Sequence, residues 1–475
     1  MQPIMAGADG SFVTGPVKLA EAALFTDLYE LTMAASYFRE GMRAPATFSL
    51  FVRKLPARRS YLIAAGLQDV LDYLASFRFS DECLNYLRSL DIFAADFLAF
   101  LRDLRFTGSV RAVAEGTLVF GDEPIVEVTA PIIEAQLVET AVLNFNHLQT
   151  LLASKASRSV IAAQGRALVD FGLRRTHGLD AGLKAARCAF LAGVDMTSNV
   201  LAGLAYNIPP AGTMAHSYVE AFPREIDSFR AFAQAFPLRT TLLIDTYDTC
   251  VAARKAVIVA KEMEARGQRL SGVRLDSGDL LRLSKDVRAI LDAAGLSYVR
   301  IFASGGLDED EVVRLLENQA PIDAFGIGTR LNVSADAPYL DMAYKLVEYD
   351  GRKVLKLSEG KRTWVGQKQV FRSRDGRGQL AGDVIGLAEE EGASGAEPLL
   401  ATVMTDGRPA RPHPSLPEVR RHCAAQLAAL PEEFRRLRDP HAYPVRVSER
   451  LAEAQDALEA RVRALEVEPP LPCLP

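Results

Sequence analysis

One histidine of this chain stands in a setting that could support chemistry. His216 lies in the stretch PPAGTMAHSYVEAF, residues 209–222, next to Ser217 and three residues after Thr213. The whole chain holds six histidines, and an imidazole with a pKa of about 6.5 can act as an acid, a base, a nucleophile or a metal ligand. A helix start with an incidental imidazole would give the same pattern. This stretch alone leaves both interpretations open.

Two aspartates follow short apolar runs in a way that favours a ligand site. Asp245 ends the run TTLLID, and Asp276 ends GVRLD. Arg274 should point to the same side as Asp276, because side chains alternate along a strand. The arginine could clamp a phosphate or a carboxylate, and the aspartates could bind ribose hydroxyls or a Mg²⁺ ion shared with a pyrophosphate. A buried ion pair is the structural alternative.

Two further stretches, ASGGLDEDEV and FGIGTR, place glycines at the ends of apolar runs. Backbone N–H groups can approach an anion closely at glycine, and a helix N-terminus adds partial positive charge. The candidate phosphate-binding residues are Ser304, Gly305, Gly306, Gly326, Gly328, Thr329 and Arg330. Tight turns alone would also explain the glycines.

The stretch DFGLRRTHG combines an aromatic residue with two arginines. Phe171 could offer its face to a flat ring, and Arg174 or Arg175 could pair with a carboxylate on that ring. The alternative is a core phenylalanine followed by two solvated arginines.

These residues need a scaffold that brings strand ends together. From about residue 135, short apolar runs alternate with helical patterns, and helices are expected over 249–266, 279–294 and 308–318. Asp248 or Thr249, Asp279, and Asp308 with Glu311 are expected to cap these helices. Units of this length predict a parallel sheet of repeated βα units. In barrels of this class the active site lies at the carboxyl ends of the strands.

The two ends of the chain have a different pattern. Residues 1–20 are expected to form a loose leader, followed by a helix over 25–41 that Thr26 or Asp27 caps. Short valine-rich runs over 108–128 predict a small β-rich unit. The stretch YKLVEYDGRKVLKLSEGKRTWVGQKQVFR predicts antiparallel strands, and a helical segment with proline breaks follows. This carboxy-terminal region is expected to pack back on the first domain.

Composition excludes several classes of protein. A net charge of −5 argues against a general nucleic-acid binder. The sequence has no run of about 18 apolar residues, so no membrane span is predicted. The five cysteines form no C-x-x-C pair, which favours reduced thiols over disulfides or a zinc site. The N-terminus does not have the pattern of a signal peptide, so we expect a cytoplasmic enzyme.

The absence of several well-known motifs excludes some classes of enzyme. The chain has neither a G-x-G-x-x-G dinucleotide fingerprint nor a Walker A loop. The predicted strand ends carry no lysine, which argues against a Schiff-base aldolase. Together, these motifs predict a site that binds a phosphorylated sugar and a flat anionic ring and that contains one reactive histidine.

At this point the sequence resembles the nicotinate phosphoribosyltransferase family, from about residue 24 to the final hundred residues. Ten stretches in order and at fitting spacing carry the resemblance: FTDLYELTMAASYF, FVRKLPARRSYLIAAGLQDVLDYL, DFGLRRTHG, TSNVLAG, GTMAHSYV, DTYDT, GVRLDSGDL, ASGGLDE, PIDAFGIGTRL and YKLVE.

The resemblance implies an α/β fold: an irregular (β/α) barrel and a second α+β domain built from both ends of the chain. The expected ranges are 1–140, 141–345 and 346–475. It also implies an ATP-coupled pentosyltransferase of NAD salvage, which joins nicotinate to phosphoribosyl pyrophosphate. ATP hydrolysis would be coupled through a phosphohistidine, Mg²⁺ would enter with the substrate, and the enzyme would be a homodimer with a shared active site.

The resemblance also implies roles for single residues. His216 would accept the γ-phosphate of ATP, and Asp245 and Asp276 would serve ribose or Mg²⁺, Asp245 also in catalysis. Arg330, the glycines and the hydroxyl residues of the two glycine stretches would hold the 5′-phosphate. The residues expected to bind the remaining substrate groups are Tyr29 (reaching the site of a neighbouring subunit), Phe171, Arg175, Thr213, Ser217, Arg274 and Asp276.

Two alternatives stay open beside this interpretation. One is a transferase for nicotinamide or quinolinate on the same fold, although TDLYELTM and GTMAHSYV resemble the nicotinate branch. The other is an inactive nucleotide-binding relative, against which the set of residues at the strand ends argues. His177 departs from the family pattern, which has a smaller or amide residue there.

Overall fold

The computed structural model describes residues 19–357 and 363–467, and most of the predicted leader lies outside them. The chain divides into two compact units: residues 1–153 with 339–475, and residues 154–338. We call these the first and the second unit. The three sequence-derived ranges stay predictions. Within the described residues, no helix is both long enough and apolar enough to cross a membrane.

The second unit is built on one parallel sheet with the strand order β7-β6-β11-β10-β9-β8. Its strands are β6 (Ala167–Asp170), β7 (Met196–Thr197), β8 (Thr241–Leu243), β9 (Gly272–Leu275), β10 (Arg300–Ala303) and β11 (Ala324–Ile327). The sheet is curled but open, because β7 and β8 are its edges. The predicted irregular barrel is thereby confirmed in the form of a half-barrel.

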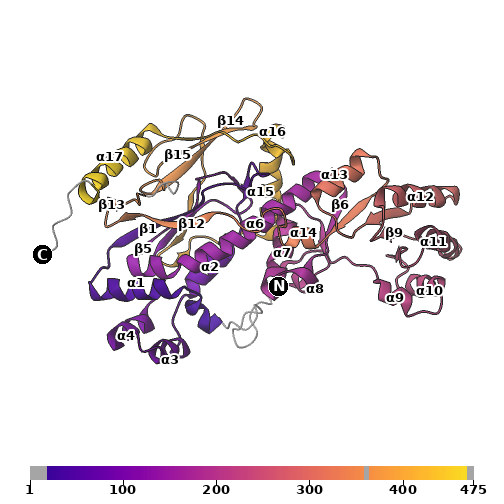
Figure 1. The fold of residues 1–475 in the computed structure, drawn as a ribbon, viewed down its shortest axis with the longest axis horizontal. Coiled ribbons are helices and arrows are strands. Elements are labelled where there is room, and N and C mark those ends of the chain that lie inside the picture. The colour runs from indigo at the N-terminus through magenta and orange to yellow at the C-terminus, as the bar shows by residue number, and fades with distance from the viewer. Residues whose placement is uncertain (1–18, 358–362, 468–475) are drawn as a thin grey trace. The chain divides into compact units, whose positions relative to one another are not determined.

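Helices follow the strands as the sequence pattern predicts. They are α7 (Leu179–Leu191), α8 (Val200–Tyr206), α9 (His216–Glu220), α10 (Glu225–Ala235), α11 (Thr249–Glu264), α12 (Leu280–Ala293), α13 (Glu309–Glu317) and α14 (Thr329–Asn332), with a 3₁₀ turn, η2 (Leu173–Arg175). Figure 1 shows α11 and α12 beside β9, against which both pack.

The predicted helix caps form in the second unit. The side chains of Asp248, Asp279 and Asp308 accept hydrogen bonds from the third residue after each of them. A cap of this kind satisfies a backbone N–H that the helix itself cannot. The caps fix where each helix begins, and so they set the length of the loop between strand end and helix.

The first unit contains mostly antiparallel strands. A seven-stranded sheet has the order β13-β12-β1-β5-β3-β17-β18, and a four-stranded sheet has the order β16-β14-β15-β19. The strands are β1 (Pro45–Val52), β2 (Leu62–Ile63), β3 (Ser109–Ala112), β4 (Leu118–Val119), β5 (Pro124–Pro131), β12 (Met342–Tyr349), β13 (Arg352–Lys353), β14 (Lys368–Arg374), β15 (Leu380–Leu387), β16 (Glu397–Pro398), β17 (Ala401–Thr405), β18 (Arg408–Pro409) and β19 (Val445–Val447).

The sheet pairing joins the two ends of the chain. Strand β1 lies between β5 and β12, which are antiparallel to it and come from opposite ends of the sequence. The helices are a 3₁₀ helix, η1 (Leu19–Leu24), and α1 (Leu28–Arg39), α2 (Leu67–Ser76), α3 (Asp81–Ser89), α4 (Ala95–Asp103), α5 (Ile132–Leu137), α15 (Leu416–Ala429), α16 (Glu432–Arg435) and α17 (Glu449–Glu466). Helix α6 (Glu139–Ala163) begins in the first unit, and its last residues belong to the second. The carboxy-terminal region therefore completes the amino-terminal domain, as predicted.

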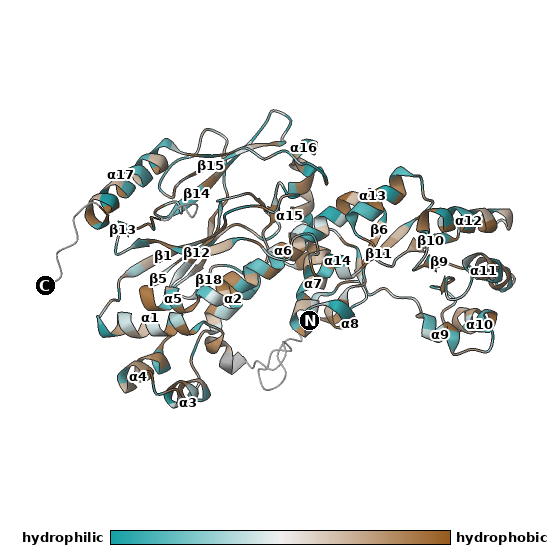
Figure 2. Ribbon diagram, viewed as in Figure 1, coloured by the Kyte–Doolittle hydropathy of each residue, from teal (hydrophilic) through white to brown (hydrophobic). Residues whose placement is uncertain are grey.

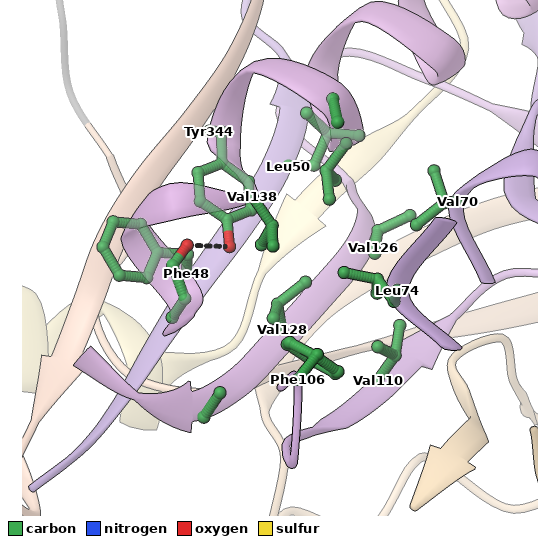
Figure 3. Packing of buried hydrophobic residues seen from close by; sticks show 14 of the residues in the cluster. Phe48, Leu50, Val70, Leu74, Phe106, Val110, Val126, Val128, Val138 and Tyr344 are labelled. Carbon is green, nitrogen blue, oxygen red and sulfur yellow. Dashed lines mark hydrogen bonds between the residues drawn. The ribbon is translucent and has the colours of Figure 1, made fainter. Parts of the chain in front are cut away.

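Apolar packing holds the first unit together. Phe48 of β1 stacks on Tyr344 of β12, with the ring centroids 4.8 Å apart. Figure 3 shows these rings beside Leu50, Val126 and other buried apolar side chains of the sheet and of α2. Figure 2 shows the matching pattern on the ribbon, with apolar residues along the strands and both apolar and polar residues on the helices.

One buried ion pair links four parts of the first unit. Arg372 of β14 and Asp383 of β15 are both essentially inaccessible to solvent, and Arg372 Nη2 lies 2.6 Å from Asp383 Oδ2. The same guanidinium donates to the carbonyl oxygen of Leu118 at 2.8 Å and to Gln426 of α15 at 3.0 Å. A charge this deeply buried must keep its partner.

We predict that Asp383→Ala lowers the free energy of unfolding by about 3–5 kcal/mol, because the buried Arg372 loses the carboxylate that it directly pairs with. The control Asp286→Ala breaks an exposed pair with Arg282 and should cost less than about 1 kcal/mol. Urea denaturation followed by circular dichroism measures both. Equal losses in the two variants would contradict the prediction.

Candidate active site

A cavity of about 720 Å³ opens in the second unit, at the carboxyl ends of the strands. The elements that form its wall are the loops after β6, β7, β9, β10 and β11 and the segment before α9. The lining residues are Phe171, Leu173, Arg174, Arg175, Ser198, Gly212, Thr213, Met214, Ala215, His216, Leu243, Arg274, Asp276, Ser304, Gly305, Gly306, Leu307, Gly326, Gly328, Thr329 and Arg330. Most of the predicted site residues therefore lie in one place.

Arg274 is at the centre of the hydrogen bonds in this cavity. Its Nη2 lies 2.6 Å from Asp276 Oδ1, its Nε donates to Ser304 Oγ at 2.8 Å, and its Nη1 donates to Thr213 Oγ1 at 3.1 Å. A guanidinium has five N–H groups. Three of them are engaged within the described part of the chain, which leaves two to bind a ligand.

Asp276 stays ionised in this setting. Burial acts to raise the pKa of its carboxyl group, but the hydrogen bond from Ser304 and the positive charge of Arg274 outweigh burial and lower that pKa below its ordinary value. Ser304 Oγ lies 2.5 Å from Asp276 Oδ1. The cavity wall therefore presents a fixed negative charge beside a fixed positive one.

His216 opens α9 and lines the cavity. Its Nδ1 lies 3.1 Å from Thr246 Oγ1, and its Nε2 lies 3.9 Å from Asp276 Oδ2. The side chain is partly exposed, so a ligand could reach it. An imidazole that is held at one nitrogen and accessible from a cavity is suited to act as a nucleophile or a general base.

Asp245 lies behind Asp276 rather than on the cavity wall. Its Oδ2 accepts hydrogen bonds from the N–H of Asp276 at 3.1 Å and from Ser277 Oγ at 2.6 Å. Its Oδ1 is buried and has no hydrogen-bond partner among the described residues. A buried carboxylate oxygen without a partner is costly, so this atom is a candidate ligand for a cation.

The described residues hold no group of three or more His, Cys, Asp or Glu side chains that could bind a metal ion. Mg²⁺ prefers six oxygen ligands and usually keeps waters or substrate oxygens among them. The two aspartates fit such an ion only if a bound substrate and water supply the remaining ligands.

The loop after β10 is a backbone feature that requires glycine. Gly305 has φ +91°, and a Cβ atom there would lie 1.7 Å from the carbonyl oxygen of Asp276. Gly306 has φ +67° and open space around it. The two glycines leave room for an anion beside the N-terminus of α13.

The loop after β6 approaches the loop after β11 closely. A Cβ atom on Gly328 would lie 2.9 Å from the carbonyl oxygen of Phe171. The guanidinium of Arg274 lies over the Phe171 ring, 5.0 Å from its centroid. The phenylalanine is therefore held beside a positive charge, an arrangement suited to an anionic aromatic ligand.

The remaining arginines of the cavity differ in their contacts. Arg175 donates to Thr329 Oγ1 at 3.4 Å, which is a weak hydrogen bond. Arg330 pairs with Asp308, the residue that caps α13. This pair ties the two predicted phosphate loops together, so Arg330 is less free to bind a phosphate than the sequence suggests.

Besides Asp245, three residues singled out from the sequence do not line this cavity. Ser217 is exposed on the first turn of α9, and His177 is exposed in the loop before α7. Tyr29 belongs to the first unit, on α1, where its hydroxyl group bonds to Glu139. Burial, followed by the negative charge of Glu139, raises the pKa of that phenol.

The start of α1 holds a buried carboxylate below this tyrosine. Glu30 is fully inaccessible to solvent and accepts hydrogen bonds from Thr26 and Thr140. Burial raises the pKa of Glu30 to about 7, against the effect of these two hydrogen bonds. Because both hydrogen bonds hold Glu30 in place, they also fix the first turn of α1, which contains Tyr29.

Sequence reasoning missed one residue that organises the cavity from behind. Asp170, at the end of β6, accepts hydrogen bonds from the N–H of Gly172 at 2.9 Å, from Thr197 at 2.8 Å and from Asn332 at 3.0 Å. It joins the loop after β6 to strand β7 and to helix α14. Asp170 is visible in the sequence as the first residue of DFG. Its role could not be predicted, because two of its hydrogen-bond partners lie 27 and 162 positions away in the sequence.

Comparison with known proteins identifies the family. A model of the nicotinate phosphoribosyltransferase (NAPRTase) family matches residues 166–374, and models of its N-terminal and C-terminal domains match residues 24–146 and 392–455. The chain belongs to the nicotinate phosphoribosyltransferase family. The resemblance inferred from ten short motifs is thereby confirmed over most of the chain.

Curated relatives with this activity in their names are similar along nearly their whole length. The nicotinate phosphoribosyltransferase pncB2 of Mycobacterium tuberculosis is 53% identical over 432 residues, which cover 90% of this chain and 92% of the relative. The Bacillus subtilis enzyme is 38% identical and covers 90% and 93%, respectively.

Solved structures have the same fold. Human nicotinic acid phosphoribosyltransferase is 32% identical and superposes with a TM-score of 0.82, covering 91% of this chain and 99% of the human one. A nicotinate-nucleotide pyrophosphorylase from Pyrococcus furiosus, at 24% identity, covers 88% and 98% with a TM-score of 0.73. The second match supports the fold alone.

We predict different outcomes for alanine at the two glycines after β10. Gly306→Ala should cost about 1–2 kcal/mol, the usual penalty for a left-handed residue that carries a Cβ. Gly305→Ala should cost at least about 1 kcal/mol more, because its Cβ overlaps the backbone of Asp276 and the strand ends must move apart. Urea unfolding compares the two variants. The same loss in both would show that the loops yield without strain.

Proposed function

We propose that the protein is a nicotinate phosphoribosyltransferase of NAD salvage. The pyridine nitrogen of nicotinate forms a bond to C1 of the ribose of phosphoribosyl pyrophosphate, and the bond from C1 to pyrophosphate breaks. The products are nicotinate mononucleotide and pyrophosphate. Hydrolysis of one ATP to ADP and phosphate is coupled to this transfer.

One observation carries the proposal. A single cavity brings together an arginine–aromatic pair, Arg274 with Phe171, two glycine loops at helix N-termini, and an accessible histidine. These are the groups that an aromatic carboxylate, a sugar phosphate and a phosphoryl donor require. The curated relatives that are similar over nine-tenths of this chain have the matching activity in their names.

Different residues of the cavity bind different parts of the substrates. Phe171 offers a ring face for the pyridine, and the two free N–H groups of Arg274 bind its carboxylate. The loops at Gly305 and Gly328 cradle the 5′-phosphate with backbone N–H groups. Asp276 and the unpartnered oxygen of Asp245 bind ribose hydroxyls or the Mg²⁺ ion that accompanies the pyrophosphate.

His216 is the acceptor of the ATP γ-phosphate in this proposal. A nitrogen of the neutral imidazole attacks the γ-phosphorus, ADP leaves, and water later hydrolyses the phosphohistidine. The phosphoryl group adds negative charge beside Asp276, 3.9 Å from the ring. A Mg²⁺ ion would compensate that charge, which would couple the phosphorylated state to Mg²⁺ and pyrophosphate binding.

Tyr29 completes the site of a second copy in a homodimer. It is exposed on α1, and its hydroxyl group is held by Glu139. A fixed, exposed aromatic ring is suited to cover the second face of a bound pyridine.

A product assay tests the activity as a whole. The purified protein receives phosphoribosyl pyrophosphate and Mg²⁺ with nicotinate, nicotinamide or quinolinate, with and without ATP. We expect nicotinate mononucleotide as the main product and stimulation by ATP. Preference for another pyridine would identify a different transferase, and no product with any pyridine would indicate an inactive relative.

We predict that Arg274→Gln lowers kcat/KM for nicotinate by at least about thirtyfold. Losing a charge-assisted pair in a dry pocket costs about 2–5 kcal/mol, and each 1.4 kcal/mol is about tenfold. Any residual use of nicotinamide should fall far less, because that substrate carries no charge. Kinetic constants for both pyridines decide this. Equal losses with a raised KM for phosphoribosyl pyrophosphate would assign Arg274 to the phosphates.

We predict that His216→Ala folds like the wild type, because its partly exposed side chain contributes little to the core. The variant should lose ATP hydrolysis and stimulation by ATP, and some phosphoribosyl transfer should survive. Labelling with γ-³²P-ATP measures the phosphoenzyme directly. An equal acid-labile signal in the variant would overturn the assignment.

We predict that Tyr29→Ala raises the KM for nicotinate and leaves the dimer intact. Mixing this variant with His216→Ala should restore ATP-stimulated activity after subunits exchange, because each mixed dimer has one unmodified site. Native mass spectrometry verifies the exchange. Mixed dimers without recovered activity would contradict a shared site.

A further inference from the structure

The inner face of the half-barrel has an unusual composition. Alternate residues of each strand face inward, and near the amino ends of β6, β9 and β11 they are small: Ala167, Gly272 and Ala324. Thr241 of β8 and Arg300 of β10 line the same space. Barrel interiors of this class are usually filled by layers of branched side chains. Here the small residues leave a second cavity of about 780 Å³.

The second cavity meets the site cavity at one aromatic residue. Phe171 lines both cavities, as do Gly212 and Thr213 of the segment before α9. On β10, Phe302 faces the second cavity, and Ser304, two residues later, faces the first. The boundary between the cavities therefore lies at the level of Phe171 and Phe302.

Two rings fill the space at this boundary. The centroids of Phe171 and Phe302 lie 5.5 Å apart, with an angle of 74° between the ring planes. A Cβ atom on Gly326 would lie 2.7 Å from Phe171 Cδ2 and 2.9 Å from Phe302 Cζ. A side chain at position 326 would therefore overlap the two rings. The aromatic pair fills the volume that a layer of branched side chains usually fills in a barrel.

The two rings are held differently. Phe171 follows a strand end where its N–H bonds to Ile327 and where Arg274 lies over its ring, and we have assigned it to the pyridine. Phe302 contacts the Phe171 ring from the side of the second cavity and stands in register with Arg274 on the neighbouring strand, but it does not line the site cavity. A smaller residue at 302 would open the boundary without removing the pyridine platform.

We propose that Phe302 is a specificity-determining residue that closes the floor of the pyridine pocket. It limits the substrate to a compact aromatic carboxylate. With a smaller side chain at 302, the joined cavities would take a pyridine carboxylate with a linear apolar tail, since Val169 and Ala324 line the space beyond. This inference rests on the proposed function, because it places the pyridine at Phe171.

The test compares Phe302→Leu with Phe325→Leu. Phe325 is fully buried on β11 and lines neither cavity, so it controls for the loss of a ring from the sheet. The substrates are nicotinate and nicotinates with an n-butyl chain at ring position 5 or 6. Steady-state kinetics gives kcat/KM for each, and calorimetry gives Kd without turnover.

We expect the ratio of kcat/KM for at least one butyl compound to that for nicotinate to rise at least about tenfold in Phe302→Leu, as one or more methylenes gain space. The ratio should stay unchanged in Phe325→Leu. The Kd of the same compound should fall in parallel. An unchanged ratio and Kd in Phe302→Leu, or the same change in both variants, overturns the proposal.

Failure of the proposed function has a different signature. If the wild-type protein makes no nicotinate mononucleotide, the proposed activity is wrong. The Kd values then still decide whether Phe302 excludes chain-bearing pyridine carboxylates from the cavity.

Discussion

The pairing of Arg274 with Asp276 is the interaction on which the site depends. It joins side chains two residues apart at the end of β9, and each also bonds to the hydroxyl group of Ser304, the residue directly after β10. The same arginine reaches Thr213, in the segment that leads to His216. One ion pair thereby sets the charge pattern of the cavity and the relative positions of three chain segments.

The surrounding backbone makes that pairing possible. Gly305 allows the strand ends of β9 and β10 to approach more closely than any other residue would permit. Asp170 performs the equivalent task on the other side by accepting hydrogen bonds from Gly172, Thr197 and Asn332. Helix caps at Asp279 and Asp308 fix the chain beyond the loops. Charged groups that attract a ligand thus stand on a rigid frame and cost little to organise when it binds.

The sequence predicted what is local and failed where contacts are distant. The caps of α11, α12 and α13, the glycine turns and the alternation of Arg274 with Asp276 follow from neighbouring residues, and the structure has all three. The predicted cap of the first helix does not form, because the side chain of Asp27 accepts no hydrogen bond from the start of α1. The pairing of Arg330 with Asp308 and the exposure of Ser217 were out of reach, because they depend on how loops from separate strands meet.

The hollow interior of the half-barrel links stability to occupancy. Small residues on the inner face bury little apolar surface, so the second unit depends on its outer helices for cohesion. A ligand bound at the carboxyl ends of the strands would add contacts that the empty unit lacks, for as long as it stays bound. Mass action then adds about 2.7 kcal/mol of stability at a ligand concentration one hundred times Kd. A cell short of these substrates would hold the enzyme in its least stable form, the one that proteases attack most readily.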